Sequence, residues 1–567
     1  MADPALIDLV GAVSGDEMMG HLRAFARWVK LSGTAEEAQS LLYVRARLDG
    51  YGYRTDLVLH DAYISLPGAA KVEVDGVVLT AITHSHGQAS PEGGARGRLV
   101  DVGDGDAAGF AGKDCGGAIV LAHGIANPAT ARLASRAGAI GQLHISPHEY
   151  IHEMCISPVW GSPTNETIHD MPRTVACSVS YDDGMAIRAR LAKGEQPAVV
   201  LHAEVDTSWR KTPILVAEMA APDGEGDSEQ PFVLLSGHHD TWYHGVMDNG
   251  SANATMLEAA RLLATRRHAW ARGLRICFWS GHSHGRYSGS VWYVDAHWAD
   301  LDRRCVAHVN VDSTGGVGAS VLENAAAMSA LTTLAGEAIR ERTGHAYLGK
   351  RKSRSSDDSL PGVGVPSMFG ALSEQPPGPV KIRNSLGWWW HTPFDTIDKL
   401  DPANLVRDTQ VFVHVLWRLV SEAVVPLDYG AHARALLAEL DAMAAAASGF
   451  SLDALIGPAL TLRDQCAMLA GRIEAAGPAE TILINDALMK VSRALVPVDY
   501  SRGDRFDHDP ALPANPWPSL DPVRALGTLT PGTDAHYFQT VAAMRARNRV
   551  AAALRAATAA LDGALAG

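Results

Sequence analysis

Histidine and aspartate gather where three short apolar runs of the chain end. The residues concerned are His238 and Asp240 after the first run, Asp248 in the following loop, His282, Ser283 and His284 after the second run, Asp312 after the third, and His391 far downstream. Imidazole and carboxylate groups are ligands that Zn, Mn and Fe accept. We therefore interpret this set as a candidate metal centre.

The elements that must position these residues form an alternating pattern. Residues 231–237, 273–280 and 305–311 predict buried strands, and residues 251–265 and 288–300 predict the helices between them. Strands that alternate with helices indicate an α/β fold with a mostly parallel sheet. A single histidine at a strand end is usually structural. Three neighbouring strands that all end in His or Asp favour a bound cation, which relieves the repulsion between carboxylates at one sheet edge.

The remainder of the chain predicts two further domains. Residues 61–205 carry short strands and helices typical of a small α/β domain, including a helix at 182–193 and a strand at 198–205. The chain becomes rich in Ala and Leu from about residue 430, with a last long helix at 535–563. We predict a catalytic domain of residues 1–60 and 206–428, an insert of residues 61–205 and a helical domain of residues 429–567.

The composition of the chain limits which binding partners and which cellular location we expect. The 567 residues carry a net charge of -14, which argues against nucleic acid and anionic membranes as partners. No apolar run is long enough to span a bilayer, and no targeting segment is visible. The six cysteines are scattered without a C-x-x-C pair, as expected for reduced thiols. We expect a cytoplasmic protein.

Several motifs together resemble the zinc aminopeptidase and glutamate carboxypeptidase II family. Residues 237–241, Gly-His-His-Asp-Thr, followed by residues 248–251, Asp-Asn-Gly-Ser, resemble its H-x-D…D-x-x-S signature. Residues 391–396 and 357–366 resemble two further motifs of the family. Residues 61–205 resemble its protease-associated insert, and the tail resembles the helical dimerisation domain of glutamate carboxypeptidase II and transferrin receptor. The resemblance implies the same architecture and a homodimer formed through the helical domain.

The resemblance also implies a role for each residue of the candidate centre. His238 is expected to bind one metal ion and Asp240 to orient its ring, while Asp248 bridges two ions. Asp312 is expected to complete the first site and His391 the second.

The family's paired glutamates, a general base and a metal ligand, are replaced here by His282-Ser283-His284, with one extra residue before Gly289. Counting from Trp279 places His282 at the base position and Ser283 at the ligand position, whereas counting back from Gly289 places His284 at the ligand position. We favour His284 as the ligand and His282 as the base or an additional ligand, because imidazole binds metals far better than serine does.

These expectations amount to a metallohydrolase with a non-standard His/Asp site. It would cleave an amide or peptide-like C–N bond of a small or short peptide-like substrate by metal-activated water, using one or two divalent ions, Zn first and Fe or Mn as alternatives. Two other readings stay open. One is a non-hydrolytic metalloenzyme, such as a lyase or an iron-dependent oxygenase, and the other is a catalytically inactive binding or scaffold protein.

Two further groups of residues compete for a functional role. His148-Glu149-Tyr150-Ile151-His152 fits H-E-x-x-H, which makes a zinc peptidase site when it lies on a helix, but no helical pattern surrounds it. His148, His152, His84 and His86 could contact substrate, although exposed loop histidines are the commoner case. A basic group could bind a carboxylate, although surface cations are commonly only solvated: Arg351, Lys352, Arg354, Lys381 and Arg383.

Overall fold

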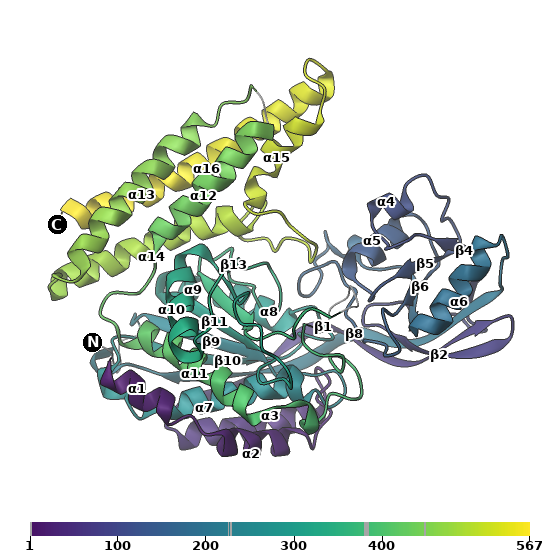
Figure 1. Ribbon diagram of the computed structural model, residues 1–567, viewed down its shortest axis with the longest axis horizontal. Helices are drawn as coiled ribbons and strands as arrows, with labels where there is room; N and C mark the ends of the chain where they lie inside the picture. Colours follow the sequence, from purple (N-terminus) through teal and green to yellow (C-terminus); the bar gives the residue numbers. More distant parts are fainter. Residues whose placement is uncertain (1–2, 225, 227–228, 379–384, 447–448, 567) are drawn as a thin grey trace.

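The computed structural model describes residues 3–566 apart from residues 225, 227–228, 379–384 and 447–448. An α/β body holds a twisted sheet, the insert projects from one end of it, and a bundle of long helices lies along one side (Figure 1). The predicted α/β fold with a mostly parallel sheet and a helical C-terminal region is confirmed. Lys381 and Arg383 lie outside the described residues.

Four parallel strands form the centre of the body. Their order is β14 (Ser367–Ala371), β11 (Cys305–Asp312), β9 (Phe232–His238) and β10 (Gly273–Trp279). Every residue of β9 and β10 is buried. Alternate side chains enter two separate cores, Leu235 and Ile276 on one face and Leu234 and Cys277 on the other. Burial on both faces explains why these strands are continuous apolar runs in the sequence.

Helices cover both faces of this sheet. On one face α7 (Ala252–Ala264) packs against α2 (Gly15–Phe25) and α11 (Pro402–Ser421). On the other face the predicted helix 288–300 is two helices, α8 (Ser288–Ala296) and α9 (Trp298–Arg304), which meet at His297. The backbone of His297 leaves the helical region there, at φ -116° and ψ 20°, so the chain turns between them.

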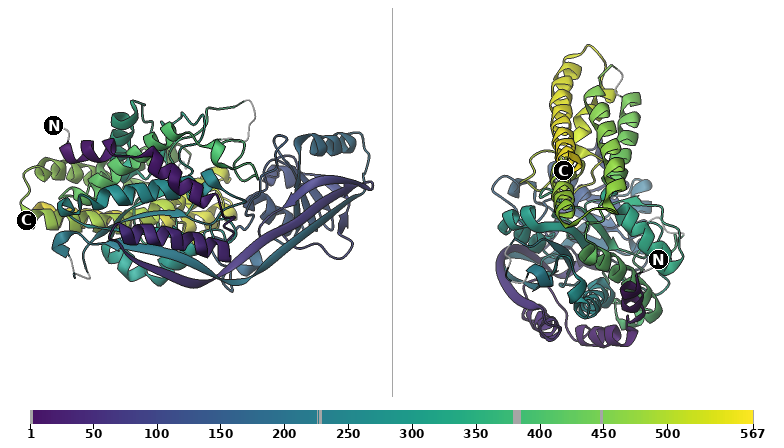
Figure 2. Two further views of the ribbon diagram at one scale, coloured as in Figure 1. Left: turned by 90° about the horizontal axis from the view of Figure 1, so that it is seen from below. Right: turned by 90° about the vertical axis from the view of Figure 1, so that its left-hand side faces the viewer.

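Two strands of 21 residues connect the body to the insert. Strands β1 (Arg54–Val74) and β8 (Val199–Met219) pair antiparallel along their whole length and run from one unit into the other (Figure 2). The predicted strand 198–205 is therefore only the first third of a much longer one. Because the connection is a paired ribbon rather than an unpaired linker, the ribbon constrains where the insert sits relative to the body.

The insert extends the sheet of the body, because its first strand pairs with β1. Its strands are β2 (Val77–Thr83), β7 (Val175–Val179), β6 (Gly141–Ile145), β5 (Ile119–His123) and β4 (Leu99–Asp101). Helices α5 (Pro128–Arg136) and α6 (Tyr181–Ala192) accompany them. Helix α5 begins with Asn127 capping the main-chain N–H of Thr130 at 3.0 Å and with Pro128 in the first turn.

The C-terminal unit consists of long helices. These are α12 (Tyr429–Ala446), α13 (Asp453–Ile473), α14 (Pro478–Tyr500) and α16 (Asp534–Ala566), and α16 packs along both α13 and α14. Leu436, Leu440 and Met443 of α12 are buried. Among the described helices, none is long and apolar enough to cross a membrane. All six cysteines are free thiols, and five are buried.

Candidate metal centre

The carboxylate of Asp248 lies between two imidazole rings. Its Oδ1 is 3.1 Å from Nε2 of His238, and its Oδ2 is 3.1 Å from Nε2 of His391. His238 is the last residue of β9, and Asp248 lies in the short helical segment η3 (Val246–Ser251) that leads into α7. Asp312, the last residue of β11, adds an oxygen 3.9 Å from Nε2 of His238. One carboxylate thus faces two separate ring nitrogens, as a bridging ligand does.

Hydrogen bonds at the far side of each ring fix its orientation. Nδ1 of His238 donates to the main-chain carbonyl of Asp240 at 2.8 Å, and Nδ1 of His391 donates to the carbonyl of Glu153 at 2.7 Å. A carbonyl can only accept, so each Nδ1 carries a hydrogen and Nε2 is the ring nitrogen turned toward Asp248. The Asp240 carboxylate, expected to orient His238, lies 3.8 Å away, so its main chain does so instead.

This arrangement calls for a positive charge between the rings. Nε2 of His238 and Oδ1 of Asp248 are buried and make no hydrogen bond to the described residues. Burial alone would lower the pKa of His238, but Asp248, Asp312 and Asp240 outweigh it and raise the pKa to about 10. A proton or a metal ion satisfies the same demand, and the set of imidazole and carboxylate donors fits a divalent transition metal.

The Asp240 carboxylate anchors the His282-Ser283-His284 loop. It accepts the main-chain N–H of Ser283 at 2.9 Å and that of His282 at 3.3 Å. It also accepts the hydroxyl of Ser32 at 2.6 Å, and the same hydroxyl lies 2.9 Å from Nδ1 of His284. Asp240 therefore holds the loop against the end of β9. Ser32 precedes the loop by some 250 residues, and no sequence signal pointed to it.

Within the candidate centre, His282 lies close to His238 and Asp312. Its ring stacks on that of His238, with centroids 3.6 Å apart and planes within 13°. Ligand atoms of His238, His282 and Asp312 all lie within 4.8 Å of one another. Nδ1 of His282 is 2.9 Å from Oδ2 of the fully buried Asp357. In the sequence Asp357 belongs only to residues 357–366, which resemble a family motif, and nothing there indicated this pair.

His284 lies beside a different aromatic residue. It is fully buried, and its Nε2 has no hydrogen-bond partner among the described residues. Its ring centroid is 4.3 Å from that of Trp242, which is itself 5.6 Å from His391. His282 thus lies next to His238, whereas His284 lies beside the tryptophan that also contacts His391. Ser283, between them, has a buried hydroxyl without a described hydrogen-bond partner.

Asp395 holds the backbone of the segment that carries Asp248. Its two oxygens accept the main-chain N–H groups of Met247 and Asp248 at 2.8 and 2.9 Å. Burial raises the pKa of Asp395 to about 7, against the effect of these two hydrogen bonds. The residue fixes the loop that carries Asp248.

The histidines of the insert differ from the sequence-based expectation. His84, His86 and His152 are buried rather than exposed, because the insert packs these loops against its own sheet and against the body. His84, for example, lies 2.7 Å from the hydroxyl of Ser178. The H-E-x-x-H residues form no helix, in agreement with the sequence analysis.

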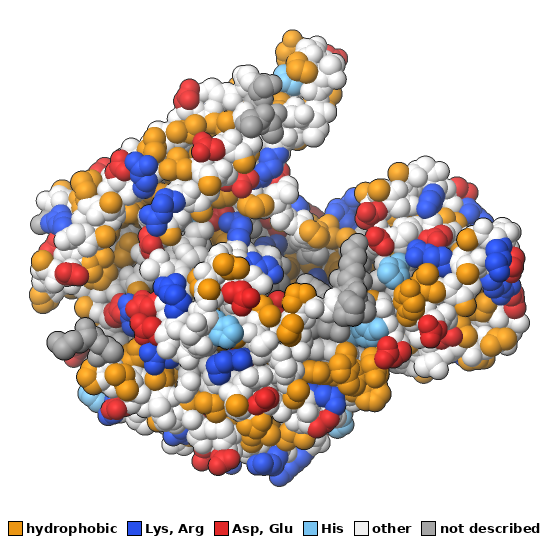
Figure 3. All heavy atoms as spheres, in the orientation of Figure 1, with side chains coloured by type: hydrophobic (Ala, Val, Ile, Leu, Met, Phe, Trp, Pro, Cys, Tyr) orange, Lys and Arg blue, Asp and Glu red, His pale blue; other side chains and the backbone are white. Residues whose placement is uncertain are grey.

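A cavity of about 490 Å³ opens where the three units meet. It is lined by the start of α5, by Arg286 and Arg354 of the body and by the segment around Tyr500 and Pro513 of the helical unit. In the space-filling view a hollow between the units contains Lys and Arg side chains (Figure 3). A chain of aromatic contacts joins it to the centre, from His282 to Tyr287 at 4.8 Å and from Tyr287 to Trp160 at 4.3 Å.

Two guanidinium groups of this cavity have no carboxylate partner among the described residues. Arg354 lies over the Trp160 ring at 4.0 Å and donates to the main-chain carbonyl of Asp509, and burial lowers its pKa to about 10. Arg286 makes one long hydrogen bond, 3.4 Å, to the carbonyl of Cys155. Arg351, by contrast, is paired with Asp499 at 2.7 Å. Unpaired guanidinium groups facing a cavity suit an anionic ligand.

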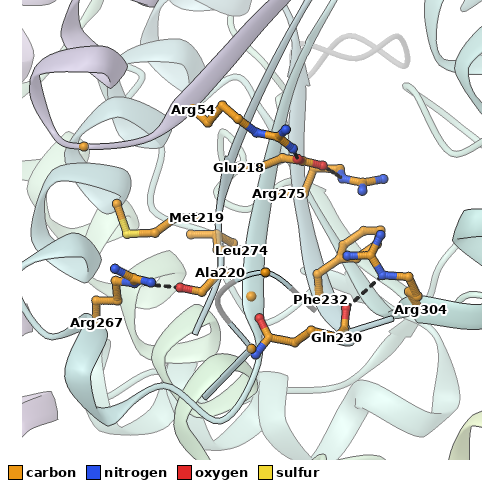
Figure 4. Close-up of a pocket in the computed structure, with 14 residues that line it drawn as sticks. Arg54, Glu218, Met219, Ala220, Gln230, Phe232, Arg267, Leu274, Arg275 and Arg304 are labelled. Carbon is orange, nitrogen blue, oxygen red and sulfur yellow. Dashed lines mark hydrogen bonds and ion pairs between the residues drawn. The ribbon is translucent and has the colours of Figure 1, made fainter. Parts of the chain in front are cut away.

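Another cavity, of about 630 Å³, lies at the opposite edge of the sheet, where β9 and β10 begin (Figure 4). Its arginines are already engaged. Arg54 and Arg275 share the carboxylate of Glu218, and Arg304 donates to the carbonyl of Gln230 at 2.9 Å. Since ligands of such sheets bind at the carboxyl ends of the strands, this cavity is not the candidate site.

Known proteins resemble this chain in sequence and in fold. Residues 218–416 match the family described as "Peptidase family M28". "Probable glutamate carboxypeptidase VP8" of Zea mays is 26% identical over 266 residues, which are 42% of this chain and 34% of that protein. The match thus spans about a third of that relative's length.

Solved structures extend the likeness to most of the chain. A zinc aminopeptidase from Bacillus subtilis superposes with a TM-score of 0.56 at 18% identity, covering 72% of this chain and 96% of its own. A peptidase M28 precursor from Shewanella amazonensis SB2B gives 0.59 at 18% identity, covering 74% and 97%. Residues 218–416 thus match peptidase family M28, and the chain has the fold seen in these zinc aminopeptidase and M28 peptidase structures.

Proposed function

We propose that this protein is a metal-dependent peptide hydrolase with a non-standard metal centre. The observation that carries the proposal is the Asp248 carboxylate, held 3.1 Å from one ring nitrogen of His238 and 3.1 Å from one of His391. His238, Asp248 and Asp312 would hold one divalent ion, and Asp248, His391 and His284 a second, with zinc as the first choice. Such ions polarise a carbonyl and lower the pKa of a bound water.

His282 is the proposed general base. The Asp357 carboxylate accepts the hydrogen of Nδ1, so Nε2 of the neutral ring remains free to take a proton from the attacking water. The same nitrogen then returns the proton to the amine that leaves as the C–N bond breaks. The side chain of His282 is 13% exposed, so it can meet a substrate while Asp357 holds it from the buried side.

The activity test measures metal and turnover on the same preparation. Protein purified without added metal is expected to carry one or two divalent ions per chain by elemental analysis, and to cleave dipeptides and amino-acid anilides. Removal of the metal with a chelator abolishes cleavage, and zinc restores it. Full activity in the metal-free protein contradicts the proposal. Iron with oxygen-dependent turnover points to redox chemistry instead, and no rebinding of metal at all indicates a binding protein.

The substrate is proposed to carry a carboxylate on the leaving side of the scissile bond. The unpaired guanidinium groups of Arg286 and Arg354 face the cavity that the aromatic contacts of Tyr287 and Trp160 connect to His282. The name of the maize relative, a probable glutamate carboxypeptidase, supports the same substrate class.

Replacement of Arg354 tests this substrate class. We expect Arg354→Ala to raise KM for a peptide with a free C-terminal carboxylate by about ten- to a hundredfold, the loss of one hydrogen bond to a charged group. The C-terminal amide of the same peptide should respond little, since it carries no charge there. Arg54→Ala, at the other cavity and 83% exposed, is the matched control. An equal rise in KM for acid and amide would contradict the carboxylate assignment.

A homodimer through the helical unit also remains a proposal. Helix α16 exposes several large apolar side chains, which suit a protein partner better than water: Tyr537, Phe538, Val541 and Met544.

A further inference from the structure

A segment of the insert runs alongside the loop that carries His391. Nδ1 of His152 donates to the carbonyl of Trp390 at 2.5 Å. Nδ1 of His391 donates to the carbonyl of Glu153 at 2.7 Å, and the N–H of Glu153 donates to the carbonyl of His391 at 3.0 Å. Three hydrogen bonds therefore join residues separated by 238 positions in the chain.

The histidines of the H-E-x-x-H motif form one chain of donors that ends at this loop. The main-chain N–H of Tyr150 donates to Nδ1 of His148 at 3.2 Å, so in the neutral ring Nε2 of His148 carries the hydrogen. Nε2 of His148 lies 2.9 Å from Nε2 of His152 and donates to it. Nδ1 of His152 is then the protonated nitrogen, which its contact with the carbonyl of Trp390 requires. One pair of neutral tautomers satisfies all three contacts.

The backbone of His391 is held in an unfavourable conformation. Its φ of 57° lies in the left-handed region, which residues with a Cβ rarely adopt. Such a conformation persists where the surroundings enforce it, commonly at functional sites. Here the Glu153 main chain binds His391 on both its ring and its carbonyl, while His152 binds the residue before it. The insert thus supplies the contacts that aim Nε2 of His391 at Asp248.

Aromatic packing fastens the same segment to both flanks of the loop. The Tyr150 ring stacks on Trp388 with centroids 4.3 Å apart and meets the edge of Phe394 at 5.5 Å. Trp390 in turn stacks on His391 itself at 3.6 Å. The loop is therefore braced by side chains as well as by hydrogen bonds, and the brace comes from the insert.

We propose that the H-E-x-x-H segment of the insert is a clamp, in which His148 and His152 act as positioning residues for the metal ligand His391. The insert then sets the metal affinity of the centre although His148 and His152 bind no metal themselves. This inference rests on the proposed function, since it requires that the centre binds a metal ion. In this proposal the H-E-x-x-H residues do not form the zinc site that their sequence pattern suggests, but position a ligand of another metal centre.

The test measures metal affinity and ligand geometry in the full-length chain. Metal-free protein is titrated with Co²⁺, and the visible absorption spectrum reports the ligand field, while Zn²⁺ affinity is taken from competition with a chromophoric chelator. We expect His152→Ala to weaken binding at the His391 position by about 10- to 100-fold and to alter the Co²⁺ spectrum, as loss of a residue that orients a metal ligand does. His148→Ala should show the lower end of that range.

Two conservative variants and one control separate positioning from general damage. His152→Asn places an amide nitrogen near the position of Nδ1, and His148→Gln places one near Nε2, so each should return affinity and spectrum toward the wild-type values. Glu149→Ala is the matched control, because Glu149 is exposed and has no part in the clamp. It should leave both readouts unchanged, whereas in a zinc site made by this motif the glutamate is the base.

The possible outcomes test the clamp and the proposed function separately. If the wild-type chain binds metal and both His152→Ala and His148→Ala show the same metal affinity and Co²⁺ spectrum as wild type, the clamp is wrong and the proposed function stands. A wild-type chain that binds no Co²⁺ or Zn²⁺ overturns both. Thermal unfolding shows whether each variant is folded. If His152→Ala is not folded, the metal affinities and Co²⁺ spectra of His148→Ala and His148→Gln decide whether the clamp is correct.

Discussion

The Asp248→Asn variant is expected to lose metal at both positions of the centre and to have a kcat/KM lower by at least about 10³-fold. A metal ion stabilises the transition state by several kcal/mol, and each 1.36 kcal/mol is a factor of ten in rate. The physical reason is the geometry of the carboxylate. Each oxygen faces a different imidazole nitrogen at 3.1 Å, so the same side chain serves both positions. Asparagine has the same shape but offers one oxygen, no charge and an N–H₂ group that a cation repels.

Elemental analysis and steady-state kinetics on the same sample measure this effect. Asp101→Asn is the control, because each oxygen of Asp101 also faces a nitrogen, accepting from the Arg188 guanidinium at 2.8 Å, but Asp101 lies in the insert away from the centre. That variant should keep wild-type metal content and activity. A metal content of Asp248→Asn equal to that of wild type would place the metal elsewhere in the chain and remove the basis of the proposed function.

The second large effect is expected at His282. His282→Ala should lower kcat by about 10²–10⁴-fold, the usual contribution of a general base, while metal content stays near that of wild type. His284→Ala should instead lose metal, because His284 is the proposed ligand beside His391. The two substitutions therefore divide the roles within the triplet. Loss of metal in His282→Ala together with retention in His284→Ala would reverse the assignment.

Asp357→Asn tests how the base is held. The Asp357 carboxylate fixes the hydrogen of His282 on Nδ1, and an amide can turn its N–H₂ group toward that nitrogen and favour the other tautomer. We expect a loss of about 10²-fold in kcat, toward the lower end of the range for a general base. Asp358→Asn is the matched control, since burial raises the pKa of this neighbouring carboxyl and it makes no described hydrogen bond to His282. Equal losses in both variants would mean that the loop, rather than the His282–Asp357 pair, matters.

Local sequence patterns predicted the elements that carry the centre. Strands β9, β10 and β11 begin and end within one residue of the predicted ranges, because each is buried on both faces and so is a continuous apolar run. The ribbon of β1 and β8 could not be predicted in the same way. It includes exposed and polar stretches such as the one around Pro67, and its residues are held by pairing with a partner more than 120 positions away.

Position along the chain also left the triplet ambiguous. Counting from Trp279 and counting back from Gly289 gave different matches for the ligand, because one extra residue can be accommodated anywhere in a loop. The fold distinguishes the two histidines by their partners, Asp357 for His282 and Ser32 with Trp242 for His284. None of these partners is adjacent in sequence.

The sequence by itself determined the α/β architecture and that His238, Asp248, Asp312 and His391 stand at strand ends and loops facing one edge of the sheet. It could do so because short runs of apolar residues predict buried strands, and their alternation with helices predicts that the strands run parallel. Only the tertiary structure decided that Asp240 orients His238 through its main chain, that Asp357 holds His282, and that the insert holds His391. The first contact joins residues two positions apart but depends on how the chain turns after β9, whereas the other two join residues 75 and 238 positions apart. Their hydrogen bonds depend on how distant segments pack, which no local pattern of residue types records.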